Sequence, residues 1–160
     1  MNWIIKKPDL KVIKSIMDTY DVPKEVAIIM NIYELSGKLE FKRFMFPNIN
    51  NFHNPFLMKG MDKAIKRIFK AIDSSQKVFI LGDSDADGIS ATSLLHEGIK
   101  FFGGEVKAFI PNRKKEGRGL RKVHIDQAIS YGCDLLITCD CGMNSFESIE
   151  YANEKSIDVI

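Results

Sequence analysis

The chain has 160 residues and a formal net charge of +2, and nearly half of its positions are hydrophobic. This composition predicts a soluble globular protein with a substantial core. Its apolar runs are far shorter than the roughly 20 residues needed to cross a bilayer, and no apolar block of signal-peptide length occurs near the start. We therefore expect a cytoplasmic protein with no membrane partner.

The first part of the chain, residues 1–60, is predicted to form a helical lead. Apolar residues recur at helical spacing over residues 10–20 and again over residues 26–33. The segment of residues 47–55 is rich in Asn and Pro, which predicts a connecting loop. An amphipathic helix face follows over residues 61–72, so we expect a domain boundary near residue 60.

The second part, residues 61–160, is predicted to be an α/β domain with a parallel, Rossmann-like sheet and flanking helices. From residue 77 onward, short apolar segments alternate with amphipathic ones, which is typical of such a sheet. The helix after the first strand carries an apolar face from Ala91 to Phe102. If the third strand lies beside the first and the second lies outside the first, right-handed crossovers create a topological switch point at their carboxyl ends. The predicted strands cover residues 78–81, 106–110, 135–138 and 157–160.

Three aspartates follow the first predicted strand, in the sequence GDSDADG of residues 82–88. Open α/β sheets bind ligands at the carboxyl ends of their strands. Asp83 and Asp85 lie two residues apart in an extended segment and so project the same way. A hard cation such as Mg²⁺ or Mn²⁺ would relieve the repulsion between such carboxylates. The motif predicts a metal site, and the alternative is a solvated acidic loop whose aspartates cap the next helix.

Two other motifs begin with similar spacing. An EF-hand loop should follow a helix and requires Glu at its twelfth position, where this chain has Leu94. The haloacid dehalogenase class places D-x-D after a first strand, but its pattern continues D-x-D-x-Thr/Val, and Asp87 occupies the fifth position here. Both interpretations are weaker than a metal site at the end of a parallel strand.

A further aspartate, Asp140, follows the third predicted strand. If the first and third strands are neighbours, Asp140 lies beside Asp83 and Asp85. Several carboxylates there could bridge two cations that polarise a phosphodiester. Taken alone, Asp140 would more often cap the helix that begins near Ser145.

A basic loop, residues 111–120 (PNRKKEGRGL), follows the second predicted strand and is expected at the same edge of the sheet. Positive charges there could hold a phosphate chain, although such runs are also common on solvated surfaces. Arg113 is the first choice for a phosphate contact, because its planar fork matches phosphate oxygens. The predicted substrate phosphate-binding residues are Arg113, Lys114, Lys115 and Arg118.

The histidines and cysteines show no ligand spacing. His53, His96 and His124 are scattered over a loop and two helices, and we interpret all three as structural. The three cysteines contain no C-x-x-C pair, and Cys133 and Cys139 are expected to be small buried hydrophobic residues.

With these motifs in view, the chain resembles the RecJ branch of the DHH phosphoesterase superfamily over essentially its whole length. Trp3 fits this resemblance, and the blocks that carry it are FPNINNFHNPFLMKGMDKA, GDSDADG, FIPNRKKEGRGL and TCDCGMNS. The resemblance implies catalytic metal-ligand roles for Asp83, Asp85 and Asp140, with Asp87 in support. It also implies Mn²⁺ or Mg²⁺ as cofactor, with two ions in the complete protein.

The activity that this resemblance implies is 5′-to-3′ exonuclease hydrolysis of single-stranded DNA in recombination and repair. A single-strand-binding protein and a helicase are the further partners it implies. The alternatives are a nano-RNase or cyclic-dinucleotide phosphodiesterase of the same superfamily, and a non-catalytic nucleic-acid-binding module.

The sequence also departs from the family pattern. Ser84 stands where an aromatic residue is common, Arg118 where Tyr is frequent, and Leu81 where some relatives have histidine. The Asp-His-His motif that names the family should come a few residues after Ile160. We therefore expect an N-terminal fragment that ends before its active site is complete and has no activity of its own.

Overall fold

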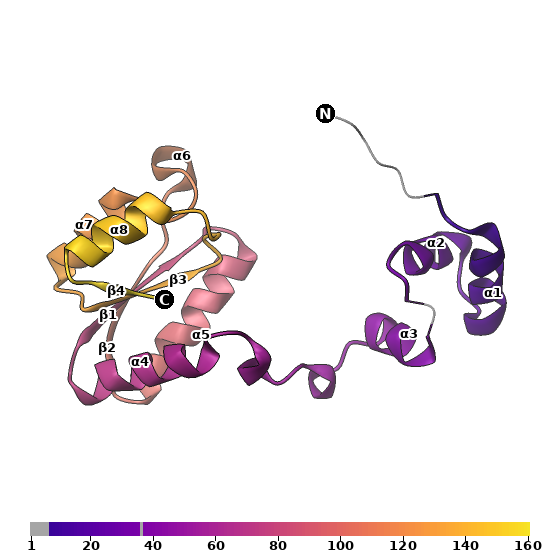
Figure 1. The fold of residues 1–160 in the computed structure, drawn as a ribbon, viewed down its shortest axis with the longest axis horizontal. Coiled ribbons are helices and arrows are strands. Elements are labelled where there is room, and N and C mark those ends of the chain that lie inside the picture. Colours follow the sequence, from indigo (N-terminus) through magenta and orange to yellow (C-terminus); the bar gives the residue numbers. More distant parts are fainter. Residues whose placement is uncertain (1–6, 36) are drawn as a thin grey trace. The chain divides into compact units, whose positions relative to one another are not determined.

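The computed structural model describes residues 7–35 and 37–160, so Trp3 lies outside the described residues. The chain divides into two compact units, one up to Asn54 and the other Pro55–Ile160. The second unit begins a few residues ahead of the helix at Met61, inside the Asn- and Pro-rich segment (Figure 1). Within the described residues, no helix is both long and apolar enough to span a membrane.

The first unit is helical, as its apolar spacing predicts. Its core consists of Ile13, Ile16, Ala27 and Met30. Asp9 begins the first helix, because its side chain accepts the N–H of Lys11 at 2.8 Å. The elements of this unit are α1 (Leu10–Tyr20), α2 (Lys24–Ile32), α3 (Lys38–Met45) and the 3₁₀ turn η1 (Ile49–Asn51).

The second unit is built on a four-stranded parallel sheet in the order β2-β1-β3-β4. The parallel sheet confirms the predicted α/β class, and its order meets the condition that the third strand lies beside the first. The last strand has only two residues, whereas four were predicted. The elements of the second unit are η2 (Pro55–Leu57), α4 (Met61–Asp73), β1 (Lys77–Gly82), α5 (Ala86–Phe101), β2 (Glu105–Phe109), α6 (Arg113–Glu116), α7 (Lys122–Tyr131), β3 (Leu135–Cys139), α8 (Phe146–Glu154) and β4 (Asp158–Val159).

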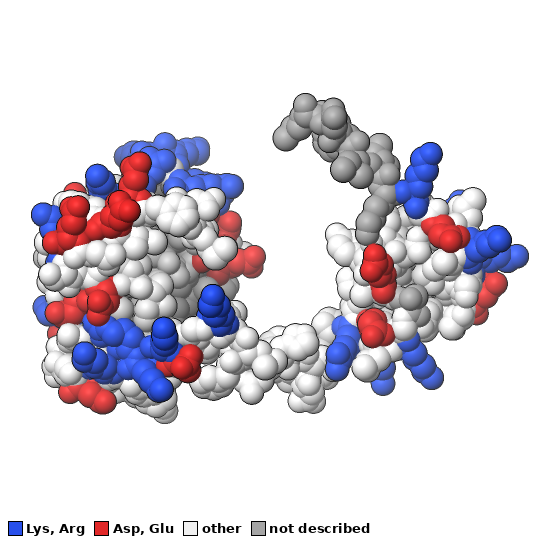
Figure 2. Space-filling view, in the orientation of Figure 1, with Lys and Arg blue, Asp and Glu red and all other residues white. Residues whose placement is uncertain are grey.

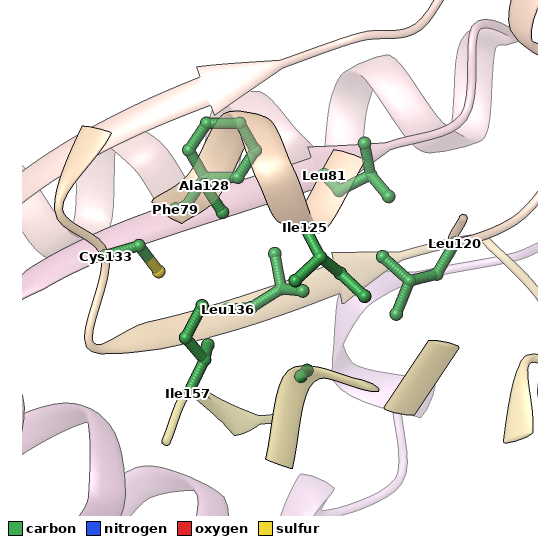
Figure 3. Packing of buried hydrophobic residues seen from close by; sticks show 9 residues of the cluster. Phe79, Leu81, Leu120, Ile125, Ala128, Cys133, Leu136 and Ile157 are labelled. Carbon is green, nitrogen blue, oxygen red and sulfur yellow. The ribbon is translucent and has the colours of Figure 1, made fainter. Parts of the chain in front are cut away.

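Helices cover both faces of this sheet: α7 and α8 lie on one face, and α4 and α5 on the other (Figure 1). Because side chains alternate along a strand, β1 sends Phe79 and Leu81 to one core and Val78 and Ile80 to the other. In the first core, Ile125 of α7 lies among residues of the sheet (Figure 3). Burial on both faces explains why the strands read as continuous apolar runs.

The apolar face predicted for the helix after β1 is only partly buried. Leu95 packs against the core on the α4 side of the sheet, but Leu94 and Phe102 are mostly exposed. Together with Ile65 and Phe69 of α4, these side chains line a shallow apolar groove between α4 and α5. Helical periodicity therefore identified the apolar side of α5 but not which part of it the sheet covers.

Arg67 ties α4 to the amino-terminal edge of the sheet. Its guanidinium donates to Asp158 at 2.5 Å and to the side chain of Gln76 at 2.9 Å. A third, longer contact reaches the backbone carbonyl of Asp134 at 3.4 Å, and the Asp134 carboxylate accepts the N–H of Lys77 at 2.9 Å. One partly buried side chain thus connects the helix before the sheet with β1, β3 and β4.

We expect Arg67→Met to destabilise the second unit by about 1–3 kcal/mol, because the hydrogen bonds to charged groups are lost while the apolar stem is kept. The free energy of unfolding can be followed through the amide NMR signals of β1 and β3 as urea is raised. Lys66→Met, which removes an exposed charge from the same helix, should cost much less. Equal losses in the two variants would contradict this role of Arg67.

Candidate functional site

The pairing of β1 with β3 places two of the predicted aspartates at one edge of the sheet. Gly82 is paired with Cys139, so the next residues are Asp83 on one strand and Asp140 on the other. The N–H of Asp83 donates to the carbonyl of Cys139 at 3.1 Å and extends this pairing. Both aspartates therefore lie at the carboxyl ends of neighbouring parallel strands, at one edge of the sheet.

The turn from β1 into α5 orients Asp83 and Asp85. Asp83 accepts the N–H of Ser84 at 2.6 Å, and Asp85 accepts the N–H of Gly88 at 3.3 Å as the N-cap of α5. A Cβ atom on Gly88 would clash with the backbone of Asp83, so no larger residue fits this turn without movement. Asp85 thus caps the next helix, as the alternative of a helix-capping acidic loop requires. Its second carboxylate oxygen accepts a hydrogen bond from Arg113 at 3.2 Å.

Asp140 adopts an unusual backbone conformation with a φ angle of 59°. Residues other than glycine rarely occupy this left-handed region, although Asp tolerates it better than most. The N-cap of α8 is Ser145, so Asp140 does not take the helix-capping role considered for it. Partial removal of water raises the pKa of its carboxyl group, and the negative charge of Asp85 raises it further, followed by those of Asp87 and Asp83. The other three aspartates therefore all act on the carboxyl group of Asp140.

Arg113 supplies the positive charge that faces this group. It is the first residue of the single helical turn α6, and its Nη2 atom donates to Asp83 at 2.7 Å and to Asp85 at 3.2 Å. Its hydrogen bond holds the pKa of Asp83 below the ordinary value, with a further contribution from the N–H of Ser84. The same contact with Asp83 raises the pKa of Arg113.

The other basic side chains of the loop remain at the surface. Lys114, Lys115 and Arg118 are exposed, and Lys and Arg side chains gather over α6 at the top of the second unit (Figure 2). Arg118 also helps to lower the pKa of Asp83 through its charge. The loop packs against the segment after β3, because a Cβ atom on Gly119 would lie 3.2 Å from the carbonyl of Cys141.

The aspartates suit a hard divalent cation, because such ions bind carboxylate oxygens. Their negative charges raise the pKa of Asp140, and a cation would relieve that repulsion. Their present arrangement is not a complete coordination sphere: among residues 7–35 and 37–160, no group of three or more Asp, Glu, His or Cys side chains is placed to hold a metal ion. Asp83 and Asp85 are instead neutralised by Arg113. The carboxylates fit the cation in the chemistry of their donor atoms.

Two residues at the site received no functional role from the sequence. Glu116 is the acidic residue within the basic loop, and His124 was interpreted as structural. In the structure, His124 is fully buried and its Nε2 atom lies 3.9 Å from Glu116 Oε1. The sequence did contain one signal for His124. It lies three residues after Arg121, and a side chain at that distance can accept the backbone N–H at the start of a helix. The buried cysteines Cys133 and Cys139 are as predicted.

The family model described as the DHH family, N-terminal domain, matches residues 77–160, which is more than half of the chain. The chain therefore belongs to the DHH family.

Among the relatives, the chain is similar to single-stranded-DNA-specific exonucleases called RecJ. That of Bacillus subtilis (strain 168) is 32% identical over 160 residues, covering 100% of this chain and 20% of the relative. That of Escherichia coli (strain K12) is 26% identical over 148 residues, covering 92% of this chain and 26% of the relative. The chain thus spans only a fifth to about a quarter of the length of these proteins.

Solved structures of RecJ are also similar. A structure of exonuclease RecJ bound to manganese matches with a TM-score of 0.60 at 29% identity, over 64% of this chain and 26% of that chain. RecJ from Thermus thermophilus in complex with Mn²⁺ matches with a TM-score of 0.62 over 97% of this chain and 21% of that chain. Its identity is 22%, so this second match supports the fold alone.

In metal-free solution, we expect Asp83 to titrate below the ordinary value of 3.8 and Asp140 above it. The stability that Asp83 contributes is then present above its unfolded-state pKa and is lost as the pH falls through its lower folded-state pKa. Asp140 acts in the opposite sense: it favours the folded state at low pH, and this contribution is lost as the pH rises through its raised pKa. Carboxyl-detected NMR titration measures both values.

Arg113→Ala should move the pKa of Asp83 upward in the same titration, because the guanidinium is the largest cause of the shift. Lys70→Ala, which removes a positive charge near the end of α4, serves as the control for net charge. An unchanged pKa of Asp83 in Arg113→Ala, or a pKa of Asp140 below 3.8, would contradict the electrostatic description of the site.

Proposed function

We propose that this chain is part of an enzyme that hydrolyses phosphodiester bonds of single-stranded DNA from the 5′ end, in recombination and repair. The observation that carries the proposal is the meeting of Asp83, Asp85 and Asp140 at one sheet edge, facing Arg113. Membership of the DHH family and similarity to RecJ exonucleases support the same substrate class. A cytoplasmic location and a role beside a single-strand-binding protein and a helicase belong to this proposal.

Asp83, Asp85 and Asp140, with Asp87 in support, would hold Mn²⁺ or Mg²⁺, and the complete protein would hold two ions. Such ions polarise the phosphodiester and make bound water a stronger nucleophile. RecJ structures with manganese support divalent cations as the cofactor. In this arrangement the unusual backbone conformation of Asp140 belongs to a functional site, where such strain is common.

Arg113 binds a phosphate of the substrate in this proposal. Its guanidinium already lies beside the carboxylates, and a phosphate group can accept the same donors in a bidentate fashion. A cation held by the aspartates would take over their neutralisation and leave those donors for the substrate. Lys114, Lys115 and Arg118 would neutralise neighbouring phosphates of the strand without reading its sequence.

A non-catalytic nucleic-acid-binding module is the second candidate. It is favoured by the ion pairs of Arg113, which satisfy Asp83 and Asp85 without a metal ion. The nano-RNase and cyclic-dinucleotide phosphodiesterase alternative shares the aspartate motif, but the helical unit before the sheet and the glycine-containing basic loop favour the RecJ branch. Cleavage by the complete protein separates these candidates.

In the complete protein, Asp85→Ala should abolish Mn²⁺- or Mg²⁺-dependent cleavage, because one carboxylate of the metal site is lost. Release of nucleotides from a single-stranded oligonucleotide labelled at either end measures both the rate and the polarity. Asp62→Ala, which removes an acidic residue from the start of α4, is the control. Near-normal turnover in Asp85→Ala would refute a catalytic role and favour the binding module.

The chain of 160 residues by itself should show no measurable nuclease activity with Mn²⁺, because its described residues do not form a complete metal site. It should retain weak, sequence-independent affinity for single-stranded oligonucleotides that falls steeply as salt rises. Fluorescence anisotropy at several salt concentrations measures this affinity. Degradation of the oligonucleotide that is lost in Asp83→Ala would show that the chain is a complete enzyme.

A further inference from the structure

The helical turn α6 is closed by its own last residue. Glu116 reaches back and accepts the N–H of Asn112 at 2.7 Å, while the Asn112 side chain accepts the N–H of Lys114 at 3.1 Å. A four-residue helix is too short to be stable through its own backbone bonds. These side-chain bonds therefore determine whether the turn forms, and with it the direction in which Arg113 leaves the backbone.

The position of the Arg113 guanidinium depends strongly on this turn. Within the described residues, its buried Nε atom has no hydrogen-bond acceptor, and both contacts with the aspartates come from the single Nη2 atom. A guanidinium held through one nitrogen can pivot, because the second bond of a forked pair is missing. The backbone of α6 has to supply the orientation that a second bond would otherwise give.

His124 faces Glu116 from the protein interior. Its Nδ1 atom accepts the N–H of Arg121 at 3.2 Å at the start of α7, so the neutral ring carries its proton on Nε2. That Nε2 atom is buried without a hydrogen-bond partner in the described part of the chain, and Glu116 Oε1 lies 3.9 Å away. The tautomer thus leaves an unpartnered N–H donor 3.9 Å from the carboxylate that closes α6.

We propose that Glu116 and His124 are positioning residues that hold α6 so that Arg113 faces the aspartates and the substrate phosphate. Glu116 closes the turn through Asn112, and His124 holds the Glu116 carboxylate from the α7 side. The phosphate part of this inference rests on the proposed function of Arg113. The positioning part concerns only contacts within this chain and can be measured without metal or substrate.

Two substitutions of His124 separate its two contacts. His124→Asn keeps an oxygen near the place of Nδ1 and so retains the cap of α7, but it removes the donor that faces Glu116. His124→Gln keeps an N–H donor near the place of Nε2 and loses the cap. Glu116→Ala removes the closure of α6 directly, and Glu150→Ala, which removes an exposed carboxylate from α8, makes the same change in net charge.

The first measurement is the side-chain ¹⁵N NMR signal of Arg113 in the metal-free chain, identified by its loss in Arg113→Lys. We expect the ion-paired guanidinium to rotate slowly and give separate Nη signals. His124→Asn and Glu116→Ala should average these signals, whereas His124→Gln and Glu150→Ala should leave them separate. Circular dichroism of each variant checks that helix content is retained, and Glu116→Ala decides the outcome if either His124 variant fails to fold.

The second measurement is the affinity for single-stranded oligothymidylate by fluorescence anisotropy. Glu116→Ala and His124→Asn should weaken binding roughly tenfold, as expected for loss of one charge-assisted contact, and adding Arg113→Ala should weaken it no further. Separate Nη signals in both Glu116→Ala and His124→Asn would overturn the positioning role. Averaged signals with unchanged affinity would instead overturn the phosphate role of Arg113 and leave the positioning role standing.

Discussion

The parallel pairing of β1 with β3 is the constraint on which the site depends. It brings Asp83 and Asp140 to the same sheet edge although 57 residues separate them in the chain. Carboxylates held this close disfavour one another's ionisation, which is why the pKa of Asp140 rises beyond the effect of lost water. The sheet must therefore be stable enough to hold an unfavourable set of charges together, and its strands are buried on both faces.

The aspartates at the ends of β1 and β3 respond to this repulsion in different ways. Asp83 is stabilised by the guanidinium of Arg113 and a backbone N–H, which lower its pKa. Asp140 has its pKa raised, and its backbone occupies a region that most residues avoid. Asp83 is thus paired with a positive charge, whereas Asp140 is surrounded by other negative charges. Such a site is suited to attract a further cation.

The chemistry of the site could be predicted from the sequence more fully than its supporting contacts. GDSDADG after an apolar strand and Asp140 after a later one located the carboxylates, because strand ends meet at one edge whatever the details of packing. The closure of α6 by Glu116 and the burial of His124 could not be predicted in this way. Both depend on side-chain direction in a loop and on contact between elements with no periodic pattern.

By itself, the sequence determined the class of fold and the identity of the acidic and basic groups that follow the strands. These follow from hydrophobic periodicity and from the position of polar residues directly after apolar segments, which are local properties of the chain. The strand order that makes β1 and β3 neighbours is seen only in the tertiary structure. Only the tertiary structure decided that Arg113 neutralises Asp83 and Asp85, and that the apolar side of α5 is partly exposed. Such outcomes depend on which side chains meet across distant segments, and the free energy of those contacts is set by geometry that one-dimensional patterns do not contain.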